Sequence, residues 1–89
     1  MEKRDIRLIE RIRKIVTDEN YNIKEIRGKD DVLNVELEKN DGDNNLLFGK
    51  LLIDITSTHN INSVVQEKNK LMITTTLPDG LFIINVFVL

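Results

Sequence analysis

Four basic residues near the start of the chain are spaced so that they would share one side of a helix. Arg4, Arg7, Arg11 and Lys14 follow one another at intervals of three, four and three residues, which gives one stripe beside an apolar helix face. Such a stripe could hold the phosphates of a nucleic acid. No aromatic residue is interleaved for base stacking, and the chain carries a net charge of -2. The pattern therefore favours a solvated face with ion pairs to acidic neighbours.

A second pattern is typical of calcium loops. Asp41, Asp43 and Asn45 occupy alternate positions, as the first oxygen ligands of such a loop do. A calcium loop also needs Gly at its sixth position and Glu at its twelfth, where this chain has Leu46 and Leu52. We therefore predict a solvated hairpin turn and no metal site.

The only histidine, His59, lies close to Asp54 and Ser57 in the sequence. In a strand, Ser57 and His59 would share one face too closely for a nucleophile and its base, so we expect His59 to cap backbone groups in a loop. The chain also has no cysteine, no Gly-rich phosphate loop and no zinc-binding helix motif. These patterns predict a protein that is no enzyme and has no catalytic, cofactor or metal site.

The C-terminal segment is the most informative one, because eight of its nine residues, Leu81 to Leu89, are apolar. A strand with one solvated face would alternate, so something must cover both faces or the edge of this strand. Two explanations stay open: a central strand of a closed or strongly curled sheet, or a dimer interface. The candidate residues are Leu81, Phe82, Ile83, Ile84, Val86, Phe87 and Val88.

The apolar residues between Asp5 and Val16 recur with helical spacing and predict an amphipathic helix. After it the period changes to that of strands. Strands are predicted at residues 21–26, 32–38, 46–56, 71–77 and 81–89, with Gly49 as a bulge in the third. Residues 60–67 fit either a strand or a helical turn, and we favour the strand. The predicted fold is α+β, with an N-terminal amphipathic helix packed on an antiparallel meander of five to six strands.

This architecture is similar in outline to cystatin-like and nuclear-transport-factor-like folds. The Gln-x-Val-x-Gly hairpin of the cystatins is absent, because Val64-Val65-Gln66-Glu67-Lys68 does not match it. The resemblance therefore implies an architecture and no activity. At 89 residues we expect a single domain spanning the whole sequence.

Composition points to an origin more than to an activity. The sequence has no Ala but ten Asn and twelve Ile, a bias that fits the codons of an AT-rich genome such as that of a virus, a phage or a mobile element. The charged N-terminal segment is unlike a signal peptide, and no apolar run is long enough to span a membrane. We expect a cytoplasmic protein, in the host cytoplasm if viral.

The function predicted by exclusion is to bind a macromolecule. A protein partner and a homodimer are favoured, in a protein–protein interaction or accessory role that could be directed at a host. The alternative is a nucleic-acid-associated protein that uses the stripe of Arg4, Arg7, Arg11 and Lys14.

Overall fold

The first helix, α1 (Lys3–Asp18), follows from the spacing of its apolar residues. In the computed structural model, which describes residues 3–38 and 42–89 and the side chains of 6–38 and 42–89, Leu8, Ile12 and Val16 are fully buried at intervals of four. The helix ends because Asn20 adopts a left-handed conformation, with φ of 65°. The amide of Tyr21 then reaches back to the carbonyl of Val16 at 3.0 Å, as in a helix C-cap. The predicted N-terminal helix is confirmed.

Strands β1 (Asn22–Lys29) and β2 (Val32–Glu38) form an antiparallel hairpin, in which Lys29 is opposite Val32. The turn consists of Asp30 and Asp31, and Asp30 has a φ of 55°, a conformation that Asp tolerates better than most residues. Alternate residues of β2, namely Leu33, Val35 and Leu37, are buried. Both strands agree with the sequence prediction.

The segment predicted as a third strand is instead a second helix, α2 (Asn44–Thr58). Asp43 caps its N-terminus, and the carboxylate accepts the backbone N–H of Asn45 at 2.9 Å. Leu47, Leu51 and Ile55 recur every four residues and are fully buried. The strand at 46–56, the bulge at Gly49 and the hairpin turn before them were wrong, because the β-branched and apolar residues of this segment conceal a helical period.

Three strands complete the sheet. They are β3 (Asn60–Gln66), β4 (Lys70–Leu77) and β5 (Gly80–Val88), so the preference for a strand at 60–67 is confirmed. Pro78 and Asp79 form the turn between β4 and β5. The following Gly80 has a φ of 152°, which favours glycine.

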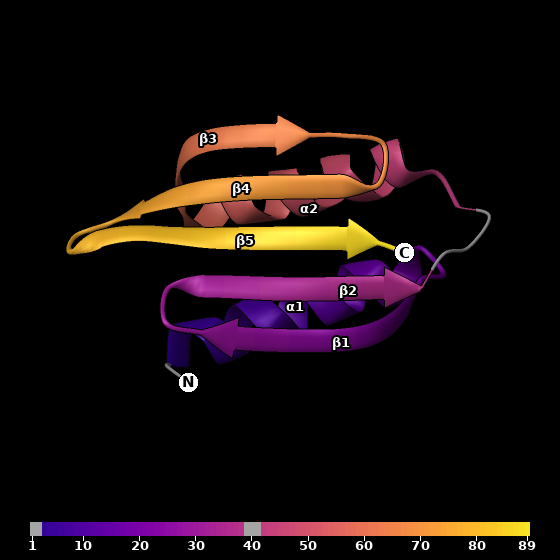
Figure 1. Ribbon diagram of the computed structural model, residues 1–89, viewed down its shortest axis with the longest axis horizontal. Helices are drawn as coiled ribbons and strands as arrows, with labels where there is room; N and C mark the ends of the chain where they lie inside the picture. Colours follow the sequence, from indigo (N-terminus) through magenta and orange to yellow (C-terminus); the bar gives the residue numbers. More distant parts are fainter. Residues whose placement is uncertain (1–2, 39–41) are drawn as a thin grey trace.

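The five strands lie in the order β1-β2-β5-β4-β3. All neighbours are antiparallel except β2 and β5, which run parallel. Each element from β2 to β5 reverses the chain direction, and α2 supplies one of these reversals (Figure 1). Had α2 been a strand, the sheet could have been the pure meander predicted. The α+β class with a largely antiparallel five-stranded sheet is confirmed.

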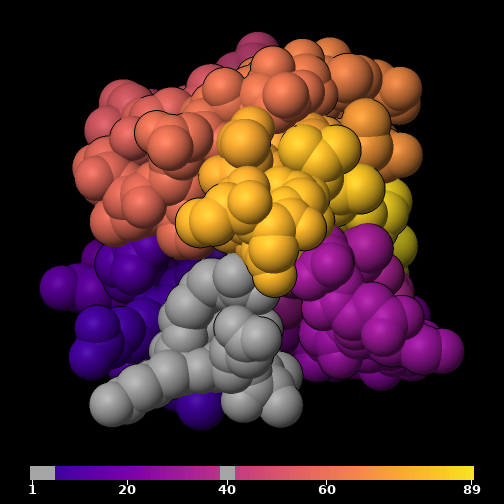
Figure 2. Space-filling view, turned by 90° about the vertical axis from the view of Figure 1, so that its left-hand side faces the viewer, coloured from indigo at the N-terminus to yellow at the C-terminus, as the bar shows by residue number. Residues whose placement is uncertain are grey.

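Both helices lie on the same side of the sheet (Figure 1). In the end-on view the indigo residues of α1 lie at the lower left and the magenta residues of the β1–β2 hairpin at the lower right (Figure 2). The core lies between the helices and the sheet. It includes Phe48 from α2 and Phe82 and Ile84 from β5. Thr75 is buried among them, and its hydroxyl donates to the carbonyl of Phe82 at 3.0 Å, so its polar group is satisfied.

Candidate functional site

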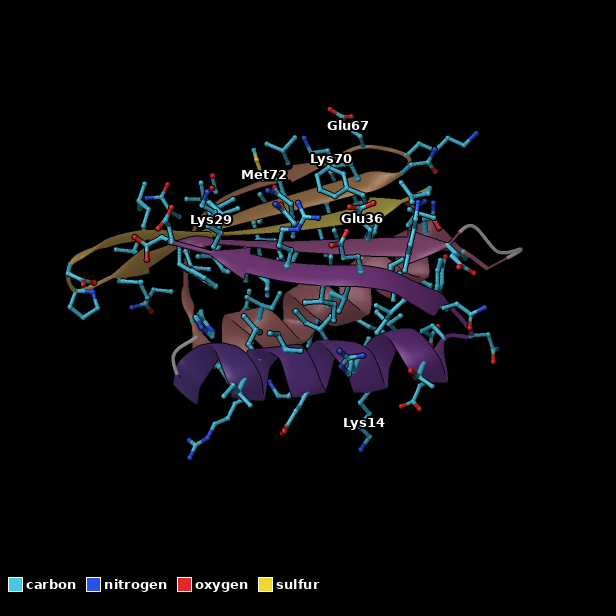
Figure 3. All side chains as sticks on the ribbon, turned by 60° about the horizontal axis from the view of Figure 1, so that its bottom comes forward. Lys14, Lys29, Glu36, Glu67, Lys70 and Met72 are labelled. Carbon is cyan, nitrogen blue, oxygen red and sulfur yellow. The ribbon has the colours of Figure 1, made fainter. Side chains whose placement is uncertain are left out.

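The sheet face opposite the helices, here called the open face, has no covering layer in the described part of the chain (Figure 1). Every second residue of each strand points towards this face, and the register aligns these residues across neighbouring strands. Lys29, Glu36, Lys70 and Met72 can be seen projecting on this side, while Lys14 of α1 points away from the sheet on the other (Figure 3). The open face carries Glu25, Arg27, Lys29, Val32, Asn34, Glu36, Ser63, Val65, Lys70, Met72, Thr74, Leu81, Ile83, Asn85 and Phe87.

A row of three residues crosses the three middle strands of the open face near the C-terminal end of β5. Glu36 of β2 and Lys70 of β4 are each the register partner of Phe87 on β5. The ammonium of Lys70 lies 5.4 Å from the centre of the Phe87 ring, within the range of a cation–π contact. The central aromatic ring is therefore flanked by opposite charges on its two sides.

Next to this row, Asn85 of β5 donates its amide to the Oδ1 of Asn34 at 2.9 Å. The Oδ1 of Asn85 is buried and accepts no hydrogen bond from any described residue. Buried side-chain oxygens usually have a donor, so the middle of the open face contains an incompletely satisfied amide pair.

Charge on the open face is concentrated at its β1 side. Glu25 is opposite Glu36 in the register, an arrangement in which two carboxylates repel. The guanidinium of Arg27 donates to Glu25 at 2.7 Å. This hydrogen bond and the charge of Glu25 raise the pKa of Arg27 above its ordinary value. Glu36 has no such close ion pair among the described residues.

The C-terminal strand is divided between the two faces. Phe82, Ile84, Val86 and Val88 are buried against the helices. Leu81, Ile83 and Phe87 belong to the open face, and Leu81 is 48% exposed. Both edges of β5 are paired, with β2 and with β4, so only these outward side chains are available to a second molecule.

The basic stripe is only partly a solvated surface. Arg11 lies between the helices, where its Nε donates to Asp54 at 2.9 Å and its Nη2 donates to Thr58 at 3.0 Å. Arg7 and Lys14 are exposed. The backbone of Arg4 is part of α1, and its side chain lies outside the described residues.

Arg7 and Arg11 line an open hollow of about 380 Å³, together with Thr58, His59 and Leu77. This hollow is at the C-terminal end of α2, where the helix dipole disfavours an anion. One of its two arginines is already paired with Asp54. The arrangement is therefore a weak phosphate site.

The other sequence patterns have structural roles. Asp43 caps α2, and Asn45 accepts the amide of Gln66 at 2.9 Å, whereas Asp41 lies outside the described residues. The hydroxyl of Ser57 donates to the carbonyl of Asp54 at 2.6 Å, away from His59. His59 caps the C-terminus of α2, and its backbone N–H donates to the carbonyl of Ile55 at 2.8 Å. No group of three or more His, Asp or Glu side chains in the described residues could hold a metal ion.

The sequence reasoning missed several exposed apolar residues of α2 and β3. Leu46 and Ile53 of α2 are 51% and 72% exposed, and Val64 and Val65 of β3 are also exposed. Between Asn44 and Gln66 the only charged residues are Lys50 and Asp54. Asp54 pairs with Arg11 of α1, and Lys50 pairs at 2.7 Å with Glu19, which directly follows α1. The spacing of Leu47, Leu51 and Ile55 was the available signal.

Comparison with known proteins gave no match to a family model, a curated protein or a solved structure. None of the described helices has the length and apolar character needed to cross a membrane.

Proposed function

We propose that this chain is a small non-enzymatic protein-binding module that self-associates through the open face of its sheet. The observation that carries the proposal is the sheet with helices on one face only, whose central strand β5 presents Ile83 and Phe87 outward. An accessory role in a virus or mobile element, in a host cytoplasm, extends the proposal from composition alone.

The size of the open face suits a protein interface. Five strands about 4.8 Å apart, with about seven residues of 3.3 Å each, span about 24 by 23 Å. Side-chain relief raises the accessible area above this flat area of about 550 Å², towards the roughly 800 Å² per partner of a standard interface.

The open face is also complementary to itself. If a two-fold axis runs parallel to β5 between two facing sheets, Phe87 meets its own copy across the axis. Glu36 and Lys70 flank that ring on opposite sides, so each Glu36 then meets Lys70 of the other copy. Two such ion pairs would supply the cation that Glu36 needs beside Glu25. Electrostatic matching of this kind fixes the orientation of partners.

The experiment is a charge swap, read by sedimentation equilibrium over a wide range of protein concentration. Glu36→Lys and Lys70→Glu should each weaken the dimer by about tenfold or more, because each juxtaposes like charges. The double variant Glu36→Lys/Lys70→Glu should recover most of the affinity, since the pairs re-form with their positions exchanged. Lys14→Glu, on the far side of α1 (Figure 3), is the matched control and should leave the dimer unchanged.

Two results would contradict the proposal. A wild-type protein that stays monomeric at high micromolar concentration has no self-association. A double variant as weak as the single ones shows that Glu36 and Lys70 do not meet across the interface.

A protein is favoured over a nucleic acid as partner because Arg11 is bonded within the fold and the open face offers a single aromatic ring, Phe87. If nucleic acid binds, its affinity should be low and should fall steeply with salt, since few basic residues would contact phosphates. Tight binding to one sequence at physiological salt would favour the nucleic-acid alternative.

A further inference from the structure

Strand β3 lies at the end of the sheet and pairs only with β4 among the described elements. Its side chains are exposed along almost the whole strand. A strand in this position presents a row of backbone N–H and C=O groups towards solvent. We propose that the outer edge of β3 is a strand-addition site for an extended, uncharged segment of a partner protein.

The opposite edge strand of the sheet, β1, is protected against pairing with another strand. β1 carries Lys24, Glu25, Arg27 and Lys29, and charged side chains are a common device against unwanted strand pairing. β3 contains no charged residue and no proline. The two edges therefore differ in the feature that decides whether another strand can pair.

The side chains of β3 define the chemistry of the added segment. Val64 is opposite Ile73 on the helix side and is 38% exposed, while Val65 is opposite Met72 on the open face and is 43% exposed. An added strand would place alternate side chains beside these two valines. Apolar or β-branched residues would bury that surface, and a charged residue would gain no ion pair from β3.

The usable length is short. The register of β3 against β4 shifts between Ile61 and Ser63, and such a bulge interrupts regular pairing. The regular part runs from Ser63 to Gln66. Main-chain hydrogen bonds along these residues would give affinity, and the two valines would give selectivity, as in other strand-addition sites.

A second copy of this chain is a poorer occupant of the edge. The proposed dimer already uses the open face, and pairing of β3 with its own copy would then link dimers through two different interfaces. The two-fold axis of the dimer would lie over β5 and that of a β3–β3 pair at the edge of the sheet, so the two axes do not intersect and repeated contacts would build an open filament. The edge proposal uses residues other than Glu36, Phe87 and Lys70, so it can fail or succeed independently of the dimer.

The test uses a capped heptapeptide of alternating valine and threonine as the probe, with full-length protein. Backbone NMR should show slower amide exchange along β3 when the probe binds, with β1 unchanged. A peptide of the same sequence, N-methylated at alternate residues, should bind at least about tenfold more weakly, because the methyl groups remove main-chain donors.

Val64→Lys should weaken binding of the probe by about tenfold, since a lysine on an edge strand disfavours pairing. Ile53→Lys also introduces a lysine at an exposed apolar position, in α2 and not in β3, and should leave the affinity unchanged. A probe that does not bind, an N-methylated peptide that binds equally well, or an equal loss in both variants would each overturn the proposal. If the protein alone grows beyond a dimer and Val64→Lys stops this growth, the occupant is a second copy and the proposed partner is wrong.

Discussion

The two helices cover the same sheet face but differ on the side that faces solvent. Each buries three residues at intervals of four, such as Ile12 in α1 and Leu51 in α2. The outward side of α1 carries charged residues, among them Arg13 and Lys14. In α2 the two charged residues, Lys50 and Asp54, are held in ion pairs, and the helix exposes Ile53. Burial of an apolar stripe is therefore common to both helices, while the outer residues determine how readily each is recognised in the sequence.

This difference explains why only α1 was predicted. In α1 the polar residues mark the period, and the amphipathic pattern stands out. In α2 apolar and β-branched residues occur on all sides, including the exposed Ile53 and Thr56, and this composition is typical of strands. Tertiary packing of Leu47, Leu51 and Ile55 overrides that local preference.

The largest expected effect tests what the helices share. Ile12→Asp and Leu51→Asp each bury an unpaired carboxylate and should cost about 3 kcal/mol or more, enough to unfold a domain of this size. The matched outward changes, Lys14→Asp and Ile53→Asp, should cost less than about 1 kcal/mol. Urea denaturation followed by circular dichroism measures all four. If Leu51→Asp is tolerated, α2 does not pack on the sheet through that side.

The next effect concerns the contact between the helices. Arg11 and Asp54 have side chains that are 32% and 24% exposed, so their ion pair is only partly screened. Arg11→Glu should cost about 1 to 2 kcal/mol, because it loses two hydrogen bonds and opposes two carboxylates. The exchange Arg11→Glu/Asp54→Arg should restore part of the loss, whereas Arg13→Glu should change stability by about 0.5 kcal/mol or less. A double exchange no better than the single variant would mean that Arg11 acts through other groups.

The candidate surfaces were predictable only in part. The apolar run from Leu81 to Leu89 correctly predicted a strand, and the structure covers one face of it, with Phe82, Ile84, Val86 and Val88. Because apolar and polar residues do not alternate in this run, the sequence does not indicate which residues face outward. That assignment depends on the parallel pairing with β2. This pairing in turn requires α2 to be a helix. The contact of Arg11 with Asp54 also requires α2 to be a helix. Because this helix was not predicted, neither the register of the open face nor the ion pair of Arg11 could be predicted.

The third effect is pH dependent and lies where α1 ends and α2 begins. Tyr21 donates its hydroxyl to Asn44 at 2.5 Å. Burial, and then the charges of Asp43 and Glu19, raise the pKa of the Tyr21 phenol above its ordinary value. The folded state therefore favours the protonated phenol. This stabilisation is complete below about pH 10 and is lost as the pH rises through the higher folded pKa.

Tyr21→Phe should cost about 1 kcal/mol near neutral pH through the lost hydrogen bond, and it should flatten the fall of stability at alkaline pH. Denaturation of both proteins between about pH 8 and 11 isolates the contribution of Tyr21, because the two proteins differ at this residue alone. Identical alkaline slopes would show that Tyr21 does not contribute.

The smallest effect tests whether the outer side of α2 is covered in solution. Gly49 lies in the interior of α2, and an added Cβ would meet nothing within 4 Å. In an uncovered helix, Gly49→Ala should raise the free energy of unfolding by about 0.5 to 1 kcal/mol, because alanine is the better helix former and restricts the unfolded chain. Gly80 has equal space but a φ of 152°, so Gly80→Ala should destabilise the protein through backbone strain. Both variants are measured by urea denaturation at low and high protein concentration. A gain for Gly49→Ala at low concentration that turns into a loss at high concentration would mean that a second copy packs closely on α2, and the open face would then not be the surface of self-association.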